Sequence, residues 1–181
     1  LVGSEMCIRD RRNMESKLVY NADSLKIRRD TYEMSNKSII NKDFVDHPGS
    51  VLIIGIREKK ILFVKQWRQP VKEFTIELPC GTLETDESSL MGADREFREE
   101  TGFAAKKYIS LGKFYAAPGY SSEMTEYFLA EKIYESSLSP DEDEEIYLEE
   151  YTLDEAMKLI KNNKIIDQGT ISALNIYKSI I

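Results

Sequence analysis

The chain has few of the residues that build disulfide frameworks and many enzyme active sites. Among its 181 residues are two cysteines, Cys7 and Cys80, and one histidine, His47. Two cysteines are too few for a disulfide scaffold, so a reducing cytoplasm is the expected compartment. One histidine leaves almost no material for a histidine-rich zinc site or a Ser-His-Asp triad. Any chemistry must therefore come from carboxylates.

Long apolar runs and an excess of positive charge are also absent. No apolar run approaches the ~20 residues of a membrane span, so no membrane partner is expected. The net charge is −7 and no basic stripe with interleaved aromatic residues stands out, which disfavours nucleic acid but not a small phosphorylated ligand. Hydrophobic residues make up 41% and charged residues 31%, values typical of one globular domain with room for a small appendage.

The N-terminal region divides into two parts. The opening LVGSEMCIRDRR lacks the apolar core of a signal peptide and resembles a translated sequencing-adapter fragment. Met14 is a natural start, so we expect residues 1–13 to be a non-native leader. Residues 14–46 contain short extended pieces broken by Asn, Asp and Ser, which predict an N-terminal β subdomain with a small antiparallel sheet. The turn signal HPGS then opens a main domain at 47–181.

The main domain mixes strands and helices without regular alternation. Apolar runs predict strands at 51–56, 61–67, 74–78, 108–117, 124–133 and 146–151, the first two joined as a hairpin. Helices are predicted at 153–161, where Thr152 and Glu155 form a capping box, and at 170–180. Because strands outnumber helices and do not alternate with them, the expected fold class is α+β.

Residues 81–103, GTLETDESSLMGADREFREETGF, predict a third helix with a loop before it. Asp86 or Ser88 can cap its start, and Gly102 suits the left-handed position that ends it. The expected buried stripe consists of Leu90, Ala93 and Phe97. Gly92 within the helix should cost ~1 kcal/mol relative to alanine, a cost that close packing against the sheet would explain.

Three glutamates of this helix, Glu96, Glu99 and Glu100, stand at i, i+3 and i+4. Their carboxylates therefore converge on one face. Adjacent like charges repel, and such a cluster is tolerable chiefly when a divalent cation neutralises it. Arg95, four residues before Glu99, is expected to form an ion pair that orients the Glu99 carboxylate. This face thus predicts a site for a hard metal ion.

The same stretch fills seven charged or glycine positions and two apolar ones: Gly81, Glu87, Arg95, Glu96, Glu99, Glu100 and Gly102, with Phe97 and Phe103. A solvated acidic helix face, the usual explanation of a glutamate-rich run, does not account for the glycines, Glu87 and Arg95. The probability of a chance match is on the order of 10⁻⁷. The pattern resembles the Nudix box, the signature of hydrolases of nucleoside diphosphates linked to another moiety.

The resemblance implies a fold and a metal site. The fold would be an α/β/α sandwich with a mixed sheet, preceded by a small sheet like that of the ADP-ribose and ADP-sugar pyrophosphatase branch, which commonly exchanges across a homodimer. Mg²⁺, or Mn²⁺ in its place, would bind Glu96, Glu100 and the backbone carbonyl of Cys80, with Glu99 on the same face. Glu87 is expected to brace the loop, with a place in a wider metal network as the alternative. Cys80 departs from the alanine usual in this branch, and a small buried neutral cysteine is favoured over a catalytic thiol.

Features outside the box bear on the substrate. Pro118 lies 118 − 102 = 16 residues after Gly102, an offset that resembles the marker of ADP-ribose pyrophosphatases. The segments ELPCG and KQWRQP are similar to the same branch. Arg68 in the second segment is predicted to grip the diphosphate, with a plain surface charge as the alternative. Glu77 in the first segment and Pro118 complete the predicted substrate-binding residues.

An acidic run at 141–145 lies between two predicted strands. The simplest interpretation is a solvated acidic loop. The resemblance implies a mobile loop that carries a catalytic glutamate at this place. Glu144 or Glu142 is therefore the predicted base that takes a proton from the attacking water, with the choice between them open. Glu99 and the supporting Arg95 complete the predicted catalytic set.

The predicted activity is Mg²⁺-dependent hydrolysis of a nucleoside diphosphate sugar, with ADP-ribose converted to AMP and ribose 5-phosphate. One alternative is the same chemistry on GDP-mannose or a UDP-sugar. Another is a non-catalytic regulatory module that binds ADP-ribose, although a mere binder would have no need for so many carboxylates. We expect a homodimer whose partner is a small molecule and not a nucleic acid or a membrane.

Overall fold

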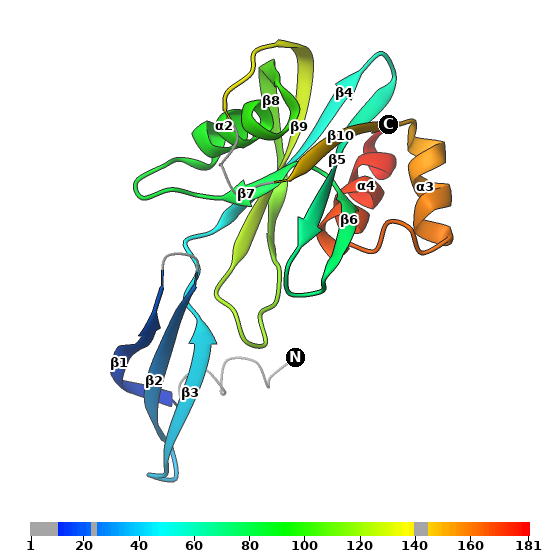
Figure 1. Cartoon of the computed structure of the whole chain (residues 1–181). Helices are drawn as coiled ribbons and strands as arrows, with labels where there is room; N and C mark the ends of the chain where they lie inside the picture. The colour runs from blue at the N-terminus through cyan, green and yellow to red at the C-terminus, as the bar shows by residue number, and fades with distance from the viewer. Residues whose placement is uncertain (1–10, 23–24, 140–144) are drawn as a thin grey trace. The chain divides into compact units, whose positions relative to one another are not determined.

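The computed structural model describes residues 11–22, 25–139 and 145–181, which fall into two compact units (Figure 1). One unit extends from the first described residue to His47 and also takes in Tyr115–Glu123. The other comprises Pro48–Phe114 and Met124–Ile181. The boundary after His47 coincides with the turn signal HPGS in the sequence.

The N-terminal unit is an antiparallel sheet of three strands in the order β1-β2-β3. These are β1 (Arg11–Asn21), β2 (Lys26–Met34) and β3 (Ile39–Val45). The predicted small antiparallel sheet is confirmed. Strand β1 pairs with β2 from Arg11 onward, so residues 11–13 of the expected leader take part in the sheet.

The segment 115–123 joins the end of β3. The Val45 N–H donates to the Tyr120 carbonyl at 2.8 Å, and the Ser122 N–H donates to the Val45 carbonyl at 3.0 Å. The Ser122 hydroxyl accepts a further bond from the His47 N–H at 2.9 Å. These bonds explain why a segment between two strands of the larger unit belongs to the smaller one.

The larger unit contains a mixed sheet of seven strands in the order β10-β5-β4-β9-β8, with β6 paired to β5 and β7 to β4. The bounds are β4 (Ser50–Arg57), β5 (Lys60–Arg68), β6 (Glu73–Glu77), β7 (Cys80–Thr82), β8 (Phe103–Tyr115), β9 (Met124–Glu135) and β10 (Ile146–Tyr151). Strand β4 runs parallel to β9 and antiparallel to β5 and β7. The sheet is therefore mixed, as predicted.

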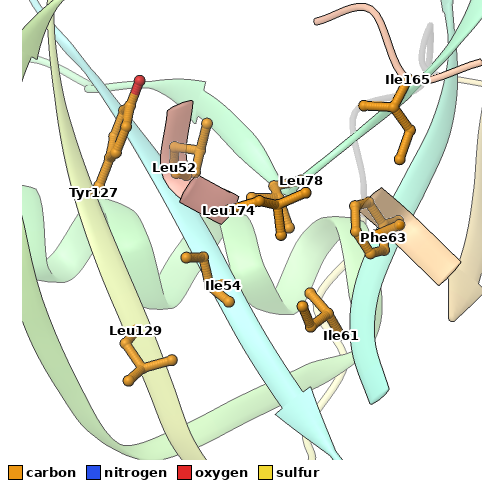
Figure 2. Packing of buried hydrophobic residues seen from close by; sticks show 11 residues of the cluster. Leu52, Ile54, Ile61, Phe63, Leu78, Tyr127, Leu129, Ile165 and Leu174 are labelled. Atoms are coloured by element: carbon orange, nitrogen blue, oxygen red, sulfur yellow. The ribbon is translucent and has the colours of Figure 1, made fainter. Parts of the chain in front are cut away.

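Helices cover both faces of this sheet: α2 (Ser89–Thr101) on one, α3 (Leu153–Lys161) and α4 (Gln168–Ile180) on the other (Figure 1). Residues of β4 alternate between the two cores. Val51 and Ile53 pack with Phe97 of α2, whereas Leu52 and Ile54 pack in the cluster that Figure 2 shows, with Leu174 of α4. A strand buried on both faces reads as a continuous apolar run. The predicted α/β/α sandwich is confirmed.

Turns and caps follow local chemistry. The hairpin between β4 and β5 turns at Glu58 and Lys59, which both have positive φ, 49° and 69°. Thr152 and Glu155 form the predicted capping box of α3. Helix α4 begins at Gln168, two residues before its predicted start, because Asp167 Oδ2 accepts the Thr170 N–H at 2.6 Å. None of the helices in the described part of the chain is long and apolar enough to cross a bilayer.

The box helix and its surroundings differ from the predictions in several details. Leu90 is 53% exposed and does not belong to the buried stripe of α2. The side chains of Leu83 and Glu87 instead cover the first turn at Gly92, where an added Cβ would lie 2.5 Å from Leu83 and 3.0 Å from Glu87. The preceding loop, not the sheet, thus explains the glycine. The short strand β7 was not predicted, and β8 begins at Phe103, five residues before its predicted start at 108.

Candidate active site

Helix α2 carries most of the candidate site, and local signals fix both of its ends. The Ser88 hydroxyl accepts the Met91 N–H at 3.3 Å, which confirms Ser88 as the N-cap. Gly102 has φ of 77° and donates its N–H to the Arg98 carbonyl at 3.1 Å. Ala93 and Phe97 are fully buried against the sheet. This anchoring fixes the rotation of the helix and directs its acidic face toward the preceding loop.

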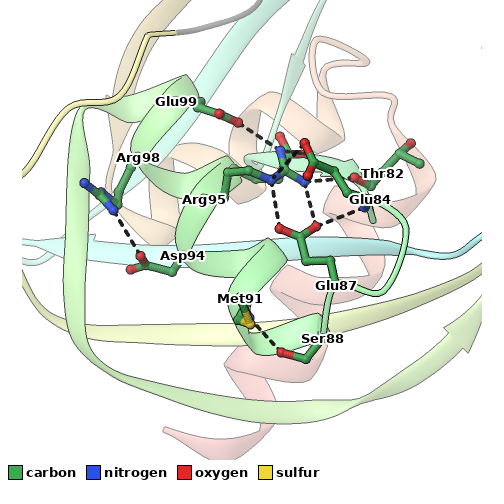
Figure 3. Close-up of polar contacts among 10 residues, drawn as sticks. Thr82, Glu84, Glu87, Ser88, Met91, Asp94, Arg95, Arg98 and Glu99 are labelled. Atoms are coloured by element: carbon green, nitrogen blue, oxygen red, sulfur yellow. Dashed lines mark hydrogen bonds and ion pairs between the residues drawn. The ribbon is translucent and has the colours of Figure 1, made fainter.

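Arg95 is the centre of the polar contacts on this face (Figure 3). Its Nη1 donates to Glu96 Oε1 at 2.8 Å and to Glu99 Oε2 at 2.9 Å. Its Nε and Nη2 bind the two oxygens of Glu87, each at 2.9 Å, and Nη2 also reaches the Thr82 carbonyl at 3.1 Å. The predicted ion pair between Arg95 and Glu99 is present, within a larger set of contacts.

Glu87 braces the loop between β7 and α2. Both of its carboxylate oxygens accept hydrogen bonds from Arg95, and Oε2 also accepts one from the Glu84 N–H at 3.0 Å. The hydrogen bond from Arg95 is the largest reason that the pKa of Glu87 is lowered, with the Glu84 N–H acting in the same direction. Asp86 in this loop has φ of 62°, a region that aspartate tolerates better than most residues. The structure thus confirms the bracing contacts predicted for Glu87.

Gly81 leaves room for the Glu96 carboxylate. A Cβ at position 81 would lie 1.9 Å from Glu96 Cδ and 2.0 Å from Glu96 Oε1. No carbon–carbon or carbon–oxygen contact is that short, so a side chain here would displace Glu96. The glycine therefore lets a carboxylate of α2 approach the backbone of β7 directly.

Glu100 and Cys80 meet on the inner side of the same helix. Glu100 is 7% exposed, and its Oε2 accepts the Cys80 N–H at 3.0 Å. Burial of the Cys80 thiol raises its pKa, and the negative charges of Glu100 and Asp167 raise it further. A neutral thiol is a poor nucleophile, so the structure favours an inert cysteine over a catalytic one.

The donor chemistry fits a hard divalent cation. Glu96, Glu99 and Glu100 supply carboxylate oxygens from one helix, and the backbone of Cys80 lies beside Glu100, whose Oε2 accepts the Cys80 N–H. Oxygen ligands of this kind are those that hard divalent cations prefer. Glu96 and Glu99 accept hydrogen bonds from Arg95, and Glu100 accepts one from the Cys80 N–H. Among the described residues, no three His, Cys, Asp or Glu side chains are therefore grouped closely enough to hold one metal ion.

Arg68 and Glu77 form a second polar unit next to the box. Arg68 Nε and Nη2 donate to the two oxygens of Glu77 at 3.0 Å and 2.5 Å, and Thr75 Oγ1 donates to Glu77 Oε1 at 2.5 Å. Burial would raise the pKa of Glu77, but the hydrogen bonds and charge of Arg68, helped by Thr75, outweigh burial and lower it. The charge of Glu100 acts on Arg68 as well. Arg68 is thus a fixed guanidinium near the box rather than a free surface charge.

The other predicted site residues are not part of these contacts. Pro118 lies in the segment 115–123 of the N-terminal unit, where the N–H groups of Tyr120 and Ser121 both donate to the Ala117 carbonyl. Its predicted role in substrate binding stays a prediction. Glu142 and Glu144 lie outside the described residues, and the identity of the base stays a prediction too.

Two threonines at the site were not predicted. Thr75 stands two residues before Glu77 on β6, and the period of two along a strand could have placed both side chains on one face. No comparable sequence signal exists for Thr170, because its contact with Leu78 spans 92 residues. Its hydroxyl accepts the Leu78 N–H at 2.8 Å.

Comparison with known proteins agrees with this geometry. The NUDIX domain matches residues 46–173. The ADP-ribose pyrophosphatase of Bacillus subtilis (strain 168) is 37% identical over 145 residues, which are 78% of this chain and 78% of that protein. The methanol dehydrogenase activator of Bacillus methanolicus is 33% identical over 168 residues, 91% of each chain. The chain belongs to the Nudix family and is a Nudix hydrolase.

A solved structure supports the fold. The crystal structure of an ADP compounds hydrolase superimposes with a TM-score of 0.82 over 94% of this chain and 93% of that one. The sequence identity of that pair is 21%, so the similarity extends to the fold alone. Nudix hydrolases generally use divalent metal ions, which agrees with the donor set on α2.

Proposed function

We propose that the protein hydrolyses the diphosphate of nucleoside diphosphate sugars with Mg²⁺, and that its main reaction converts ADP-ribose to AMP and ribose 5-phosphate. The observation that carries this proposal is the set of carboxylates held by Arg95, with Glu96 and Glu99 on one guanidinium and Glu87 behind it. Concentrated carboxylates of this kind suit a cation that offsets the charge of a diphosphate.

The reaction consumes one water molecule. The water oxygen forms a new bond to phosphorus, one bridging P–O bond of the diphosphate breaks, and the water gives up its protons to the base and the products. Bound Mg²⁺ would supply the positive charge that offsets the phosphate oxygens and makes the water more acidic. Glu96, Glu99, Glu100 and the Cys80 carbonyl would hold it.

The chain's own groups would divide the remaining work. Arg95 keeps the Glu99 carboxylate in a fixed direction. Arg68, which Glu77 grips with both oxygens, would present its remaining donors to the diphosphate. Glu144 or Glu142 would accept a proton from the water.

Two observations support ADP-ribose as the main substrate. The relative from Bacillus subtilis is named an ADP-ribose pyrophosphatase, and Pro118 stands at the offset that resembles the marker of that branch. GDP-mannose or a UDP-sugar is the alternative within the same chemistry. A regulatory module that binds ADP-ribose is a second candidate, and its support is that the relative from Bacillus methanolicus is named an activator of another protein.

An assay of purified protein separates these candidates. With Mg²⁺ we expect AMP from ADP-ribose, no AMP in excess EDTA, and slower turnover of GDP-mannose and UDP-sugars. Glu99→Gln or Glu100→Gln should lower turnover at least about a hundredfold, or about 2.7 kcal/mol of barrier, in a folded protein. Glu135→Gln, which changes an exposed glutamate at the end of β9, is the matched control and should keep full activity. Tight ADP-ribose binding without AMP release would favour the regulatory module.

We also propose that the protein works as a homodimer in the cytoplasm, with the N-terminal sheet of residues 14–46 as the dimerisation element. The low cysteine content supports a reducing compartment. Light scattering after size-exclusion chromatography measures the mass of the particle in solution. One chain has a mass of 20.9 kDa, so a particle of that mass would contradict the dimer.

A further inference from the structure

Three different elements hold the three consecutive residues that follow β6, the last of which, Cys80, begins β7. The bonds are Leu78 N–H to Thr170 Oγ1 of α4 at 2.8 Å, Ile53 N–H of β4 to the Pro79 carbonyl at 2.8 Å, and Cys80 N–H to Glu100 Oε2 of α2 at 3.0 Å. This short segment therefore takes its position from both helical layers and the central strand. It delivers Cys80 and Gly81 to the acidic face of α2.

The Thr170 contact comes from α4, far outside the box region in the sequence. Thr170 is fully buried, and its hydroxyl is the acceptor that satisfies the Leu78 N–H. The first turn of α4 fixes this hydroxyl, because the Thr170 N–H donates to Asp167 Oδ2 at 2.6 Å. Gly169 allows the close approach of that turn, since a Cβ there would lie 3.1 Å from Leu52. The hydroxyl is thus held rigidly by the helix and the sheet.

The position of this segment matters because Gly81 and Glu96 fit together with no spare room. The space that a Cβ on Gly81 would fill is occupied by the Glu96 carboxylate, 1.9 Å from that point. A shift of the backbone by a few tenths of an ångström would move Gly81 against Glu96 and weaken the bond from Cys80 to Glu100. Upstream, Glu77 is protected from such a shift by its pairing with Val64 in the sheet and by its two bonds to Arg68.

We propose that Thr170 is a positioning residue of the active site, which acts through the Leu78 N–H to set the backbone at Cys80 and Gly81 against Glu100 and Glu96. The proposal rests on the proposed function, since it concerns the metal-binding face of the same site. Removal of the hydroxyl oxygen leaves a buried N–H without an acceptor, and the segment relaxes to find another. The loss falls on the carboxylate face and not on the Arg68–Glu77 pair.

Thr170→Val and Thr170→Ser test this role in the full chain. Valine keeps the shape without the oxygen, and we expect Mn²⁺ to bind the substrate-free protein about tenfold more weakly, a change of about 1.4 kcal/mol. At a fixed Mg²⁺ concentration below saturation, kcat for ADP-ribose should fall by a similar factor while KM stays within about twofold. Serine retains the acceptor, so it should restore both quantities. Amide exchange at Leu78 should be faster in Thr170→Val only.

Thr152→Val is the matched control, because it removes the N-cap hydroxyl of α3 away from the box. It should lower the melting temperature and leave Mn²⁺ affinity and kcat unchanged. If Thr170→Val does not fold, Thr170→Cys, with a weak sulfur acceptor in nearly the same volume, should give an intermediate loss of Mn²⁺ affinity. A lower melting temperature with unchanged Mn²⁺ affinity in Thr170→Val or Thr170→Cys overturns the proposal.

The two proposals fail separately. If the parent protein releases no AMP from ADP-ribose, the proposed function is wrong, yet the Mn²⁺ affinities of Thr170→Val and Thr170→Ser still decide the role of Thr170. If the parent is active and the Thr170 variants bind Mn²⁺ like the parent, only the positioning role is wrong.

Discussion

Arg95 and Glu87 face each other through two hydrogen bonds, Nε to Oε1 and Nη2 to Oε2, each 2.9 Å long. The pair joins helix α2 to the loop before it, eight residues away. Because this fork fixes the plane of the guanidinium, the remaining nitrogen Nη1 is directed at Glu96 and Glu99. One planar cation thus sets the directions of three carboxylates, a task that a point charge cannot perform.

Arg95→Lys should therefore impair the enzyme although it keeps the charge. A lysine can satisfy one or two of these carboxylates but not all of them in fixed directions. We expect kcat to fall at least about tenfold, or about 1.4 kcal/mol, and the free energy of unfolding to fall by about 1–3 kcal/mol. Steady-state kinetics and urea denaturation measure the two quantities.

Arg98→Lys is the control for that substitution. Arg98 lies on the same helix but contacts Asp94 at 3.5 Å and the Ser136 carbonyl at 3.3 Å, outside the acidic face. Its kcat should stay within about twofold of the parent value. Equal kcat values for the parent and Arg95→Lys would show that the fork does not orient the carboxylates.

Glu77 should make the stability of the protein sensitive to acid. Its pKa lies below the ordinary value of 4.5, because Arg68 and Thr75 together outweigh the effect of burial. The unfolded chain therefore binds a proton more readily than the folded one, so stability rises with pH in this window. This contribution is complete above the unfolded pKa and is lost as the pH falls through the folded pKa.

Urea denaturation between about pH 6 and pH 3 should reveal this contribution. The free energy of unfolding of the parent should fall more steeply below about pH 4.5 than that of Glu77→Gln, which has no carboxylate to protonate. Glu135→Gln changes an exposed glutamate and should follow the parent curve. Parallel curves for the parent and Glu77→Gln would contradict the role of the Arg68–Glu77 pair.

The sequence predicted the parts of the fold and site that local spacing determines. The i, i+3, i+4 spacing of Glu96, Glu99 and Glu100 placed them on one face, and Ser88 and Gly102 marked the helix ends because capping depends on neighbours. Arg95 and Glu99 were also within one helical turn of each other. Contacts of this kind involve residues that are close in the sequence, so the spacing of residue types predicts them.

The remaining features depend on contacts between distant segments. Thr170 meets Leu78 across 92 residues, and no periodicity in either segment encodes that meeting. The exposure of Leu90 depends on how the loop before α2 packs on its first turn. Residues 115–123 join the N-terminal unit through bonds to Val45 that only the folded chain brings together. Tertiary packing, not local propensity, decides such cases.

Gly81→Ala should disturb the acidic face of α2, the proposed metal site, directly. The new methyl group would lie 1.9 Å from the present position of Glu96 Cδ, so the carboxylate must move away from the backbone of β7. We expect Mn²⁺ affinity and kcat each to fall at least about tenfold. A tenfold loss corresponds to about 1.4 kcal/mol, which lies within the usual cost of forcing an extra methyl group into a packed site. Calorimetric titration with Mn²⁺ and AMP release measure the effects.

Gly112→Ala is the control for strain without displacement of a carboxylate. Gly112 has φ of 121°, so alanine is strained there, and the nearest atom to its Cβ belongs to Phe114. This variant should lose stability but retain the parent Mn²⁺ affinity. If Gly81→Ala also retains that affinity, Glu96 does not need its position beside Gly81.

The hairpin between β4 and β5 should be improved by residues that favour positive φ. Glu58 and Lys59 have φ of 49° and 69°, the geometry of a two-residue turn that prefers Asn-Gly. The double variant Glu58→Asn, Lys59→Gly should gain about 1 kcal/mol, which corresponds to about 2–4 °C in Tm for a chain of this size. Lys59→Val should lower Tm instead, because a β-branched residue is strained at that φ.

Calorimetry measures both shifts, and kcat should stay unchanged in the double variant because neither residue belongs to the site. A double variant that melts at or below the parent temperature would show that the two side chains make contacts worth more than the relief of backbone strain.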